Sequence, residues 1–211
     1  FEKTWLKKIA AVNPDMQVVH TDRGIPKIPM AANHVESEHR RQKDHQDHHG
    51  ERDPHIWLSP RLVMTQARTI LKAVINTDPD PKALYEANTK VFVAKLAALD
   101  ADLKDIFADK RGAQFMVFHP SWGYFAGDYG LQQVPVEIEG KDPKPAQLKG
   151  LIEHAKRKHI KIIFVQPQFS TRSADLVAKE IGGQVIFADP LASDWSGNLR
   201  EVAQKLKAAL R

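Results

Sequence analysis

The feature that most constrains the fold is a regular alternation of short apolar segments with amphipathic segments after residue 111. Short stretches with the apolar, β-branched and aromatic content typical of strands lie at residues 114–118, 133–138, 161–165 and 184–188. Helical periodicity occupies the intervals and the end of the chain, at residues 122–129, 145–158, 172–181 and 197–210. This alternation predicts parallel βαβ units and therefore an α/β fold with a doubly wound sheet.

Two longer helical patterns precede this region. Ser59-Pro60 combines a capping residue with proline at the first helical position, and the pattern continues to about Asn76. The pattern at residues 81–109 predicts a helix about 40 Å long, which could join two lobes as a rigid rod; a coiled coil is the alternative. We therefore expect a partial N-terminal lobe at 1–77, a linking helix at 78–110 and a C-terminal α/β lobe at 111–211.

The first thirty residues contain few elements. Residues 1–12 have helical spacing of apolar side chains, and residues 17–19 predict a short strand. One helix and one strand cannot bury their own apolar faces. We therefore expect the N-terminal lobe to be incomplete, with the chain starting midway through it.

Composition excludes several kinds of protein. The chain has 211 residues, 42% of them hydrophobic, and no cysteine, which rules out thiolate metal sites and disulfides. The net charge of +5 is spread over predicted helix faces, so we expect no nucleic-acid partner. No apolar run approaches the length of a membrane span. Phosphate-binding glycine loops, the Gly-x-Ser-x-Gly elbow and the His-Glu-x-x-His motif are also absent.

A histidine-rich tract lies within residues 31–53, a connection longer than compact domains usually carry. Its histidines sit among charged and amide side chains without large apolar neighbours: His34, His39, His45, His48 and His49. Such composition is typical of metal-binding segments. A cloning tag or a solvated loop is the alternative.

Polar residues follow the predicted strands where a parallel sheet usually binds ligands. They are His119, Glu139, Gln166 and Asp189. Together with His55, which lies between the tract and the first long helix, His119 and Asp189 would form a His, His, carboxylate set of the type that zinc accepts. His119 could instead complete a helix turn, and Asp189 could be a plain turn residue. Gln166 is a poor ligand and is expected to orient a neighbour by hydrogen bonding, while Glu137 and Glu139 could hold a partner or cap a loop.

Four motifs in order resemble those of the zinc/manganese solute-binding proteins of bacterial metal ABC transporters. They are DPHIWLSP at 53–60, HPSWGYFA at 119–126, EGKDPKP at 139–145 and ADPLA at 188–192. The similarity begins at FEKTWL in residues 1–6 and spans most of the chain.

The resemblance implies two pseudo-symmetric α/β lobes bridged by a long helix, with the metal held between them. It further implies that His55 and His119 are imidazole ligands and Asp189 the carboxylate ligand. Histidine rather than glutamate at 119 favours Zn²⁺ over Mn²⁺, and the tract at 34–49 resembles the histidine-rich loop of zinc-type members. The family's first histidine ligand has no counterpart here, and Gln166 replaces a common glutamate.

The predicted function is therefore zinc capture outside the cytoplasm, by a periplasmic or membrane-tethered monomer that delivers the ion to an ABC permease. A zinc hydrolase with Glu139 as base is one alternative. A metal buffer that binds through the tract, and a manganese-type binding protein, are the others.

Overall fold

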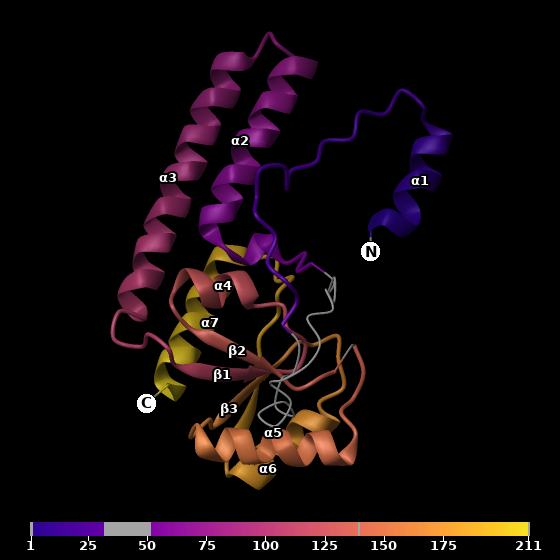
Figure 1. The fold of residues 1–211 in the computed structure, drawn as a ribbon. Coiled ribbons are helices and arrows are strands. Elements are labelled where there is room, and N and C mark those ends of the chain that lie inside the picture. Colours follow the sequence, from indigo (N-terminus) through magenta and orange to yellow (C-terminus); the bar gives the residue numbers. More distant parts are fainter. Residues whose placement is uncertain (1, 32–51, 139, 211) are drawn as a thin grey trace, which may run out of the picture.

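The computed structural model describes residues 2–31, 52–138 and 140–210. Within this part of the chain, β1 (Gln114–Val117), β2 (Gln132–Pro135), β3 (Ile162–Val165) and β4 (Gln184–Phe187) form one parallel sheet in the order β2-β1-β3-β4 (Figure 1). The strands lie within one to three residues of the predicted bounds. The α/β fold with a parallel sheet is confirmed.

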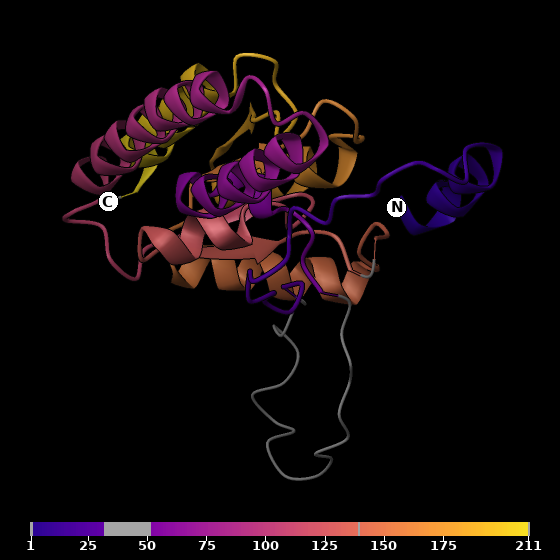
Figure 2. The same ribbon diagram turned by 90° about the horizontal axis from the view of Figure 1, so that it is seen from above.

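Helices cover both faces of this sheet, as a parallel sheet requires. Successive strand residues point to opposite faces, so Phe115 and Val117 join the core beneath α4 (Gly123–Asp128) and α7 (Trp195–Ala209), whereas Met116 joins the core beneath the other helices. These are α5 (Pro145–Arg157) and α6 (Arg172–Ile181), which lie side by side on the opposite face (Figures 1 and 2).

A helical pair extends away from the sheet. α2 (Pro60–Thr77) and α3 (Lys82–Ile106) run side by side and are joined by a short turn (Figure 1). The Ser59 side chain caps α2 by accepting a hydrogen bond from the backbone N–H of Leu62 at 3.1 Å, as the Ser-Pro pair predicts. The second half of α3 packs against α7, and its Leu99 and Leu103 are buried in the same core as Phe115.

The N-terminal segment differs from the prediction in one respect. α1 (Glu2–Val12) forms, but the predicted strand at residues 17–19 is not a strand. Val18 and Val19 are each 43% exposed, and a β-branched pair without a neighbouring strand has no ladder to join. No helix among the described residues is long and apolar enough to cross a membrane.

Several predicted site residues lie outside the described part of the chain. They are Glu139 and the tract residues His34, His39, His45, His48 and His49. His55, His119, Gln166 and Asp189 are all described.

Candidate metal site

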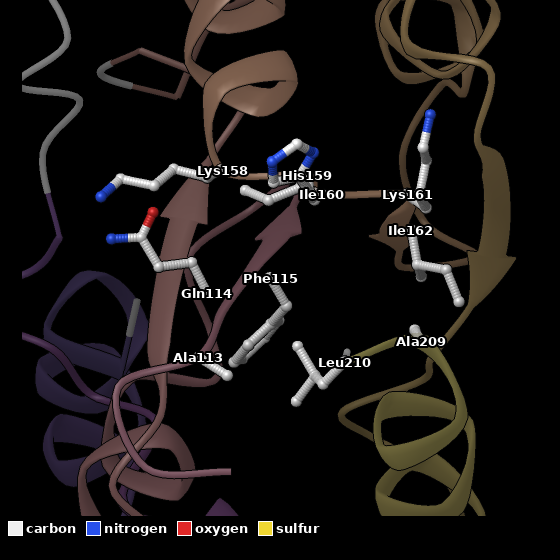
Figure 3. Close-up of a pocket in the computed structure, with 10 residues that line it drawn as sticks. All are labelled: Ala113, Gln114, Phe115, Lys158, His159, Ile160, Lys161, Ile162, Ala209 and Leu210. Carbon is white, nitrogen blue, oxygen red and sulfur yellow. The ribbon is translucent and has the colours of Figure 1, made fainter.

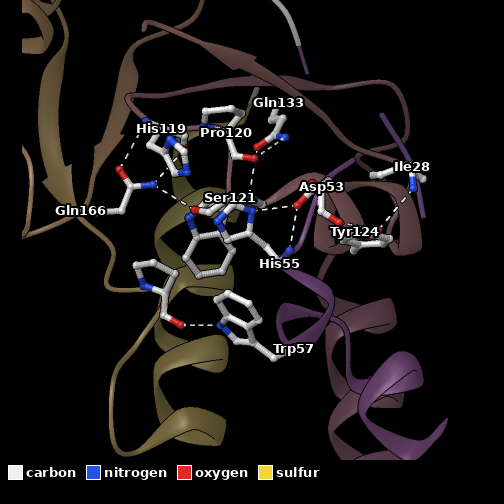
Figure 4. Close-up of polar contacts among 12 residues, drawn as sticks. Ile28, Asp53, His55, Trp57, His119, Pro120, Ser121, Tyr124, Gln133 and Gln166 are labelled. Atoms are coloured by element: carbon white, nitrogen blue, oxygen red, sulfur yellow. Dashed lines mark hydrogen bonds and ion pairs between the residues drawn. The ribbon is translucent and has the colours of Figure 1, made fainter. Parts of the chain in front are cut away.

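The structure brings His55 and His119 together from distant parts of the chain (Figure 4). His55 directly precedes the short 3-10 helix η1 (Ile56–Leu58), and His119 follows β1. Their ring centroids lie 5.2 Å apart with an interplanar angle of 74°. His55 is 9% exposed, so the pair lies at the boundary between the interior and the surface.

A buried carboxylate orients the His55 ring. Asp53 Oδ1 accepts a hydrogen bond from the His55 backbone N–H at 2.9 Å and lies 2.7 Å from His55 Nδ1. Because a carboxylate accepts, this contact favours the tautomer with the proton on Nδ1 and leaves Nε2 with a free lone pair. A carboxylate on the far nitrogen is the usual support of a metal-binding imidazole.

Asp53 is itself held in place through its backbone. The Tyr124 hydroxyl donates to Asp53 O at 2.9 Å and accepts from the backbone N–H of Ile28 at 3.2 Å (Figure 4). Burial raises the pKa of the Tyr124 hydroxyl, which keeps it protonated as a donor. The backbone N–H of Asp53 also donates to Ile28 O at 2.9 Å. The backbone of the turn at 53–55 is therefore held by Tyr124 at the Asp53 carbonyl and by Ile28 at the Asp53 N–H.

His119 has a matching support from a neighbouring strand. Glu137 Oε1 lies 2.8 Å from His119 Nδ1, which again leaves Nε2 as the free nitrogen. The parallel register that pairs Val117 with Pro135 brings position 137 beside position 119. The ring of Phe169 stacks on the His119 ring, with centroids 5.2 Å apart and an interplanar angle of 16°. The imidazole is therefore contacted on its face by Phe169 and at Nδ1 by Glu137.

Each supporting carboxylate has one oxygen that makes no hydrogen bond within the described residues. Asp53 Oδ2 and Glu137 Oε2 are buried and have no hydrogen-bond partner among the described residues. Burying an ionised oxygen without a partner is costly. Two such oxygens next to a histidine pair create a negative field that a bound cation would compensate.

Gln166 organises the turn that carries His119. It is 1% exposed, and its Oε1 accepts from the His119 backbone N–H at 3.3 Å. Its Nε2 donates to His119 O at 2.8 Å and to Ser121 Oγ at 2.9 Å (Figure 4). The Gln166 amide thus bonds both the backbone N–H and the backbone C=O of His119, and it adds no charge to the site.

Asp189 follows β4 and lies half-buried in a turn. Its Oδ1 accepts from the Leu191 backbone N–H at 2.9 Å and from Gln168 Nε2 at 3.3 Å. In the part of the chain that the structure describes, no three or more histidine, aspartate or glutamate side chains form a group ready to hold a metal ion. Asp189 therefore engages its own turn, while His55 and His119 face each other.

The sequence analysis assigned no role to Asp53, and it left Glu137 either to hold a partner or to cap a loop. The spacing Asp53-Pro54-His55 is a local signal, because an aspartate side chain commonly bonds the backbone two residues on. Glu137 has no such local signal, since its partner depends on how β1 and β2 pair. His154 on α5 is half-buried, and its Nε2 contacts Gln114 Oε1 at 2.9 Å.

A separate pocket of about 440 Å³ lies at the opposite edge of the sheet (Figure 3). Its walls combine the apolar side chains of Phe115, Ile162 and Leu210 with Lys158 and Lys161. The two lysine side chains point away from each other (Figure 3), and Lys161 Nζ donates to the backbone O of Ile181. Polar groups do not converge there as they do around the histidine pair.

Comparison with known proteins agrees with the resemblance. The family model for zinc-uptake complex component A, periplasmic (ZnuA), matches residues 1–209. The high-affinity zinc uptake system protein ZnuA of Bacillus subtilis is 37% identical over 134 residues, covering 63% of this chain and 42% of the relative. The zinc-binding lipoprotein AdcA of Streptococcus pneumoniae is 29% identical over 193 residues, covering 90% and 38%. The chain thus spans about two fifths of the length of these relatives.

Solved structures give the same result. A crystal structure of ZnuA has 42% sequence identity and a TM-score of 0.89, covering all of this chain and 76% of that one. A zinc-bound ZnuA mutant that lacks residues 138–173 of its own numbering has 43% identity and a TM-score of 0.86, covering 99% and 74%. Because the family model matches nearly the whole chain, this protein belongs to the ZnuA family of periplasmic zinc-uptake components.

Proposed function

We propose that this protein captures Zn²⁺ and delivers it to a membrane ABC permease. The observation that carries the proposal is the histidine pair, in which each imidazole has a buried carboxylate on Nδ1 and a free Nε2. Neutral imidazole nitrogen is a preferred zinc ligand. Zinc is named in the relatives as the bound or transported ion, which supports the same cargo here.

The proposed ligands are His55 Nε2, His119 Nε2 and the carboxylate of Asp189. Asp189 lies at the carboxyl end of β4, the same edge of the sheet from which His119 projects. The bonds from Leu191 and Gln168 both go to Asp189 Oδ1, so Oδ2 is the oxygen proposed to ligate, and the turn keeps these bonds. Imidazole rather than carboxylate at position 119 favours Zn²⁺ over Mn²⁺, which suits harder oxygen ligands.

The site is better suited to binding than to hydrolysis. A zinc hydrolase needs an open coordination position and a base within reach of the bound water. Asp53 and Glu137 each support an imidazole Nδ1, and Glu139, the base that the hydrolase alternative requires, lies outside the described residues. The family is one of transport components rather than enzymes.

We place the protein outside the cytoplasm, as a monomer in the periplasm or tethered to the membrane. The family description and the lipoprotein relatives support this location. The proposed division is a first lobe at 1–77, a linking helix at 78–110 and a second lobe at 111–211. We further propose that the tract at 34–49 adds weaker zinc sites beside the main one, and that Glu139 lies near that main site.

The decisive experiment separates the histidine pair from the tract. All variants are made in a background where His34, His39, His45, His48 and His49 are replaced by asparagine. Zinc affinity is measured by competition with a chromophoric chelator for this background and for the His55→Ala/His119→Ala double variant. The background should retain tight binding of one ion, and the double variant should lose it.

His159→Asn is the matched control, since His159 is an exposed histidine in a left-handed turn (φ 54) that asparagine also tolerates. It should bind zinc as the background does. Equal affinity in the double variant and the background would reject the site, and loss of all binding in the background would assign capture to the tract.

A further inference from the structure

Trp57 contacts both of the chain segments that carry proposed ligands (Figure 4). Its ring lies edge-on to His55, with centroids 5.2 Å apart and an interplanar angle of 61°. Its indole Nε1 donates to Pro190 O at 2.9 Å, and Pro190 directly follows Asp189. One side chain therefore spans from the first histidine to the turn of the carboxylate.

We propose that Trp57 is a positioning residue that fixes the Asp189 turn relative to His55, and so sets how well the carboxylate completes the zinc site. This inference rests on the function proposed above. It assigns Trp57 no contact with the ion.

The start of α7 reinforces this connection from the other side. Trp195 Nε1 donates to Trp57 O at 2.9 Å, and Asn198 Nδ2 donates to Asp189 O at 2.8 Å. We call these residues, Trp57, Pro190, Trp195 and Asn198, the Trp57 bridge. Trp57 and Trp195 both pack against the main core of the C-terminal region, so the bridge is anchored on a rigid base.

The Asp189 turn combines these hydrogen bonds with apolar anchoring, since Ala188 is 2% exposed and Pro190 is buried. Leu191 is 64% exposed, and Asp189 is half-buried. Two backbone carbonyls fix the turn between these points, that of Asp189 through Asn198 and that of Pro190 through Trp57. Metal sites require ligands placed to within about 0.5 Å, so losing one of these bonds should affect binding more than stability.

The test compares Trp57→Phe in two backgrounds. Phenylalanine keeps an aromatic ring beside His55 but removes the Nε1–H donor to Pro190. Zinc affinity is measured by chelator competition for the parent, Trp57→Phe, Asp189→Ala and the double variant. Loss of one hydrogen bond should weaken binding about fivefold in the parent. It should have little further effect once Asp189 is removed, because the group being positioned is gone.

Tyr85→Phe is the control for loss of a single hydrogen bond. The Tyr85 hydroxyl donates to Asp78 Oδ2 at 2.6 Å on the exposed surface of the α2–α3 pair, and its removal should leave zinc affinity unchanged. If Trp57→Phe weakens binding equally with and without Asp189, or not at all, the positioning role is wrong.

A second measurement reads the bridge without metal. The Leu191 backbone N–H is bonded to Asp189 Oδ1, so its hydrogen exchange reports on the order of the turn. Trp57→Phe should speed this exchange severalfold, and Tyr85→Phe should not; unchanged exchange would overturn the inference. A parent that binds no zinc would reject the proposed function, while the exchange result would still decide whether Trp57 orders the turn.

Discussion

The two halves of the histidine pair reach the same geometry by different routes. In the first half, Asp53 is two residues from His55 and contacts both its backbone N–H and its ring. In the second half, Glu137 is 18 residues from His119 and reaches it through the pairing of β1 with β2. One orientation is set by a local turn, and the other is set by the sheet.

This difference predicts how each half fails. The ring contact in the first half spans only two residues, although Tyr124 and Ile28 hold the backbone of Asp53. A contact across strands is lost as soon as the sheet is disturbed.

Removing the supporting carboxylates should have the largest effect on function. Asp53→Ala and Glu137→Ala should each weaken zinc binding roughly 10- to 100-fold, the usual cost of losing the outer partner of a metal-binding histidine. Asp53→Ala should also lower the free energy of unfolding by about 1–3 kcal/mol, because the buried His55 N–H loses its acceptor. Chelator competition and urea denaturation measure the two effects.

The amide variants Asp53→Asn and Glu137→Gln are the controls, since they keep an acceptor and remove the charge. Equal losses of stability in the two alanine variants would remove the distinction between a local and a sheet-dependent half.

Gly123→Ala tests how strongly α4 positions the Asp53 carboxylate of the first half. A Cβ at this position would lie 2.7 Å from Asp53 Oδ2 and 3.0 Å from Gln133 Nε2. Overpacking of this kind should cost about 1–3 kcal/mol of stability and displace Asp53, thereby weakening zinc binding. Gly127→Ala in the same helix is the matched control, because nothing lies within 4 Å of its Cβ. If both variants are equally stable, α4 does not hold Asp53 as described.

Ser59→Ala should cost about 1 kcal/mol through loss of the helix cap on α2. Asp194→Ala removes the equivalent cap on α7, where the side chain accepts from the Gly197 N–H at 3.0 Å. Ser59 is fully buried and also donates to Asp128, so its loss should be the greater of the two. Chemical denaturation of both variants measures the difference, and a larger loss for Asp194→Ala would contradict it.

The smallest expected effect is a pH dependence centred on Asp128. Burial raises the pKa of this carboxyl above its ordinary value of 3.8, although the Ser59 hydroxyl and Arg61 oppose the shift. The folded protein therefore binds this proton more readily than the unfolded chain. Asp128 should add stability as pH falls through its raised pKa, reach its full contribution below about 3.8, and lose it as pH rises.

Asp128→Asn is the reference for this measurement, because asparagine does not titrate. As the pH is lowered from neutral to 4, the melting temperature of the parent should rise relative to that of the variant. A gap that stays constant or moves in the opposite direction would contradict the raised pKa.

Much of the fold could be predicted because its signals are local. α6 has the predicted bounds, and it ends at Gly182 in a left-handed conformation (φ 60), which is a common helix terminator. The strands were found from short apolar runs. The strand expected at 17–19 failed because strand formation needs a partner, and the pattern of Val18 and Val19 contains no information on whether one is present.

The candidate site was only partly predictable for the same reason. His55 and His119 could be selected from motif and strand-end position. The role of Glu137 could not, because it follows from the β1–β2 register. The turn role of Asp189 was one of the two readings that the sequence allowed, and its Oδ1 does accept from Leu191 and Gln168. The tract at 34–49 and Glu139 lie outside the described residues, so those predictions stand untested.

The α2–α3 pair, whose N-cap is Ser59, starts next to the candidate site and extends away from it. α2 starts five residues after His55 and has 18 residues, so its far end lies about 27 Å away and a tilt of about 6° at its base would displace that end by about 3 Å. A small tilt of α2 near the imidazoles would thus become a larger displacement at the turn between α2 and α3. A spin label at position 80, in that turn, is therefore expected to move when zinc binds.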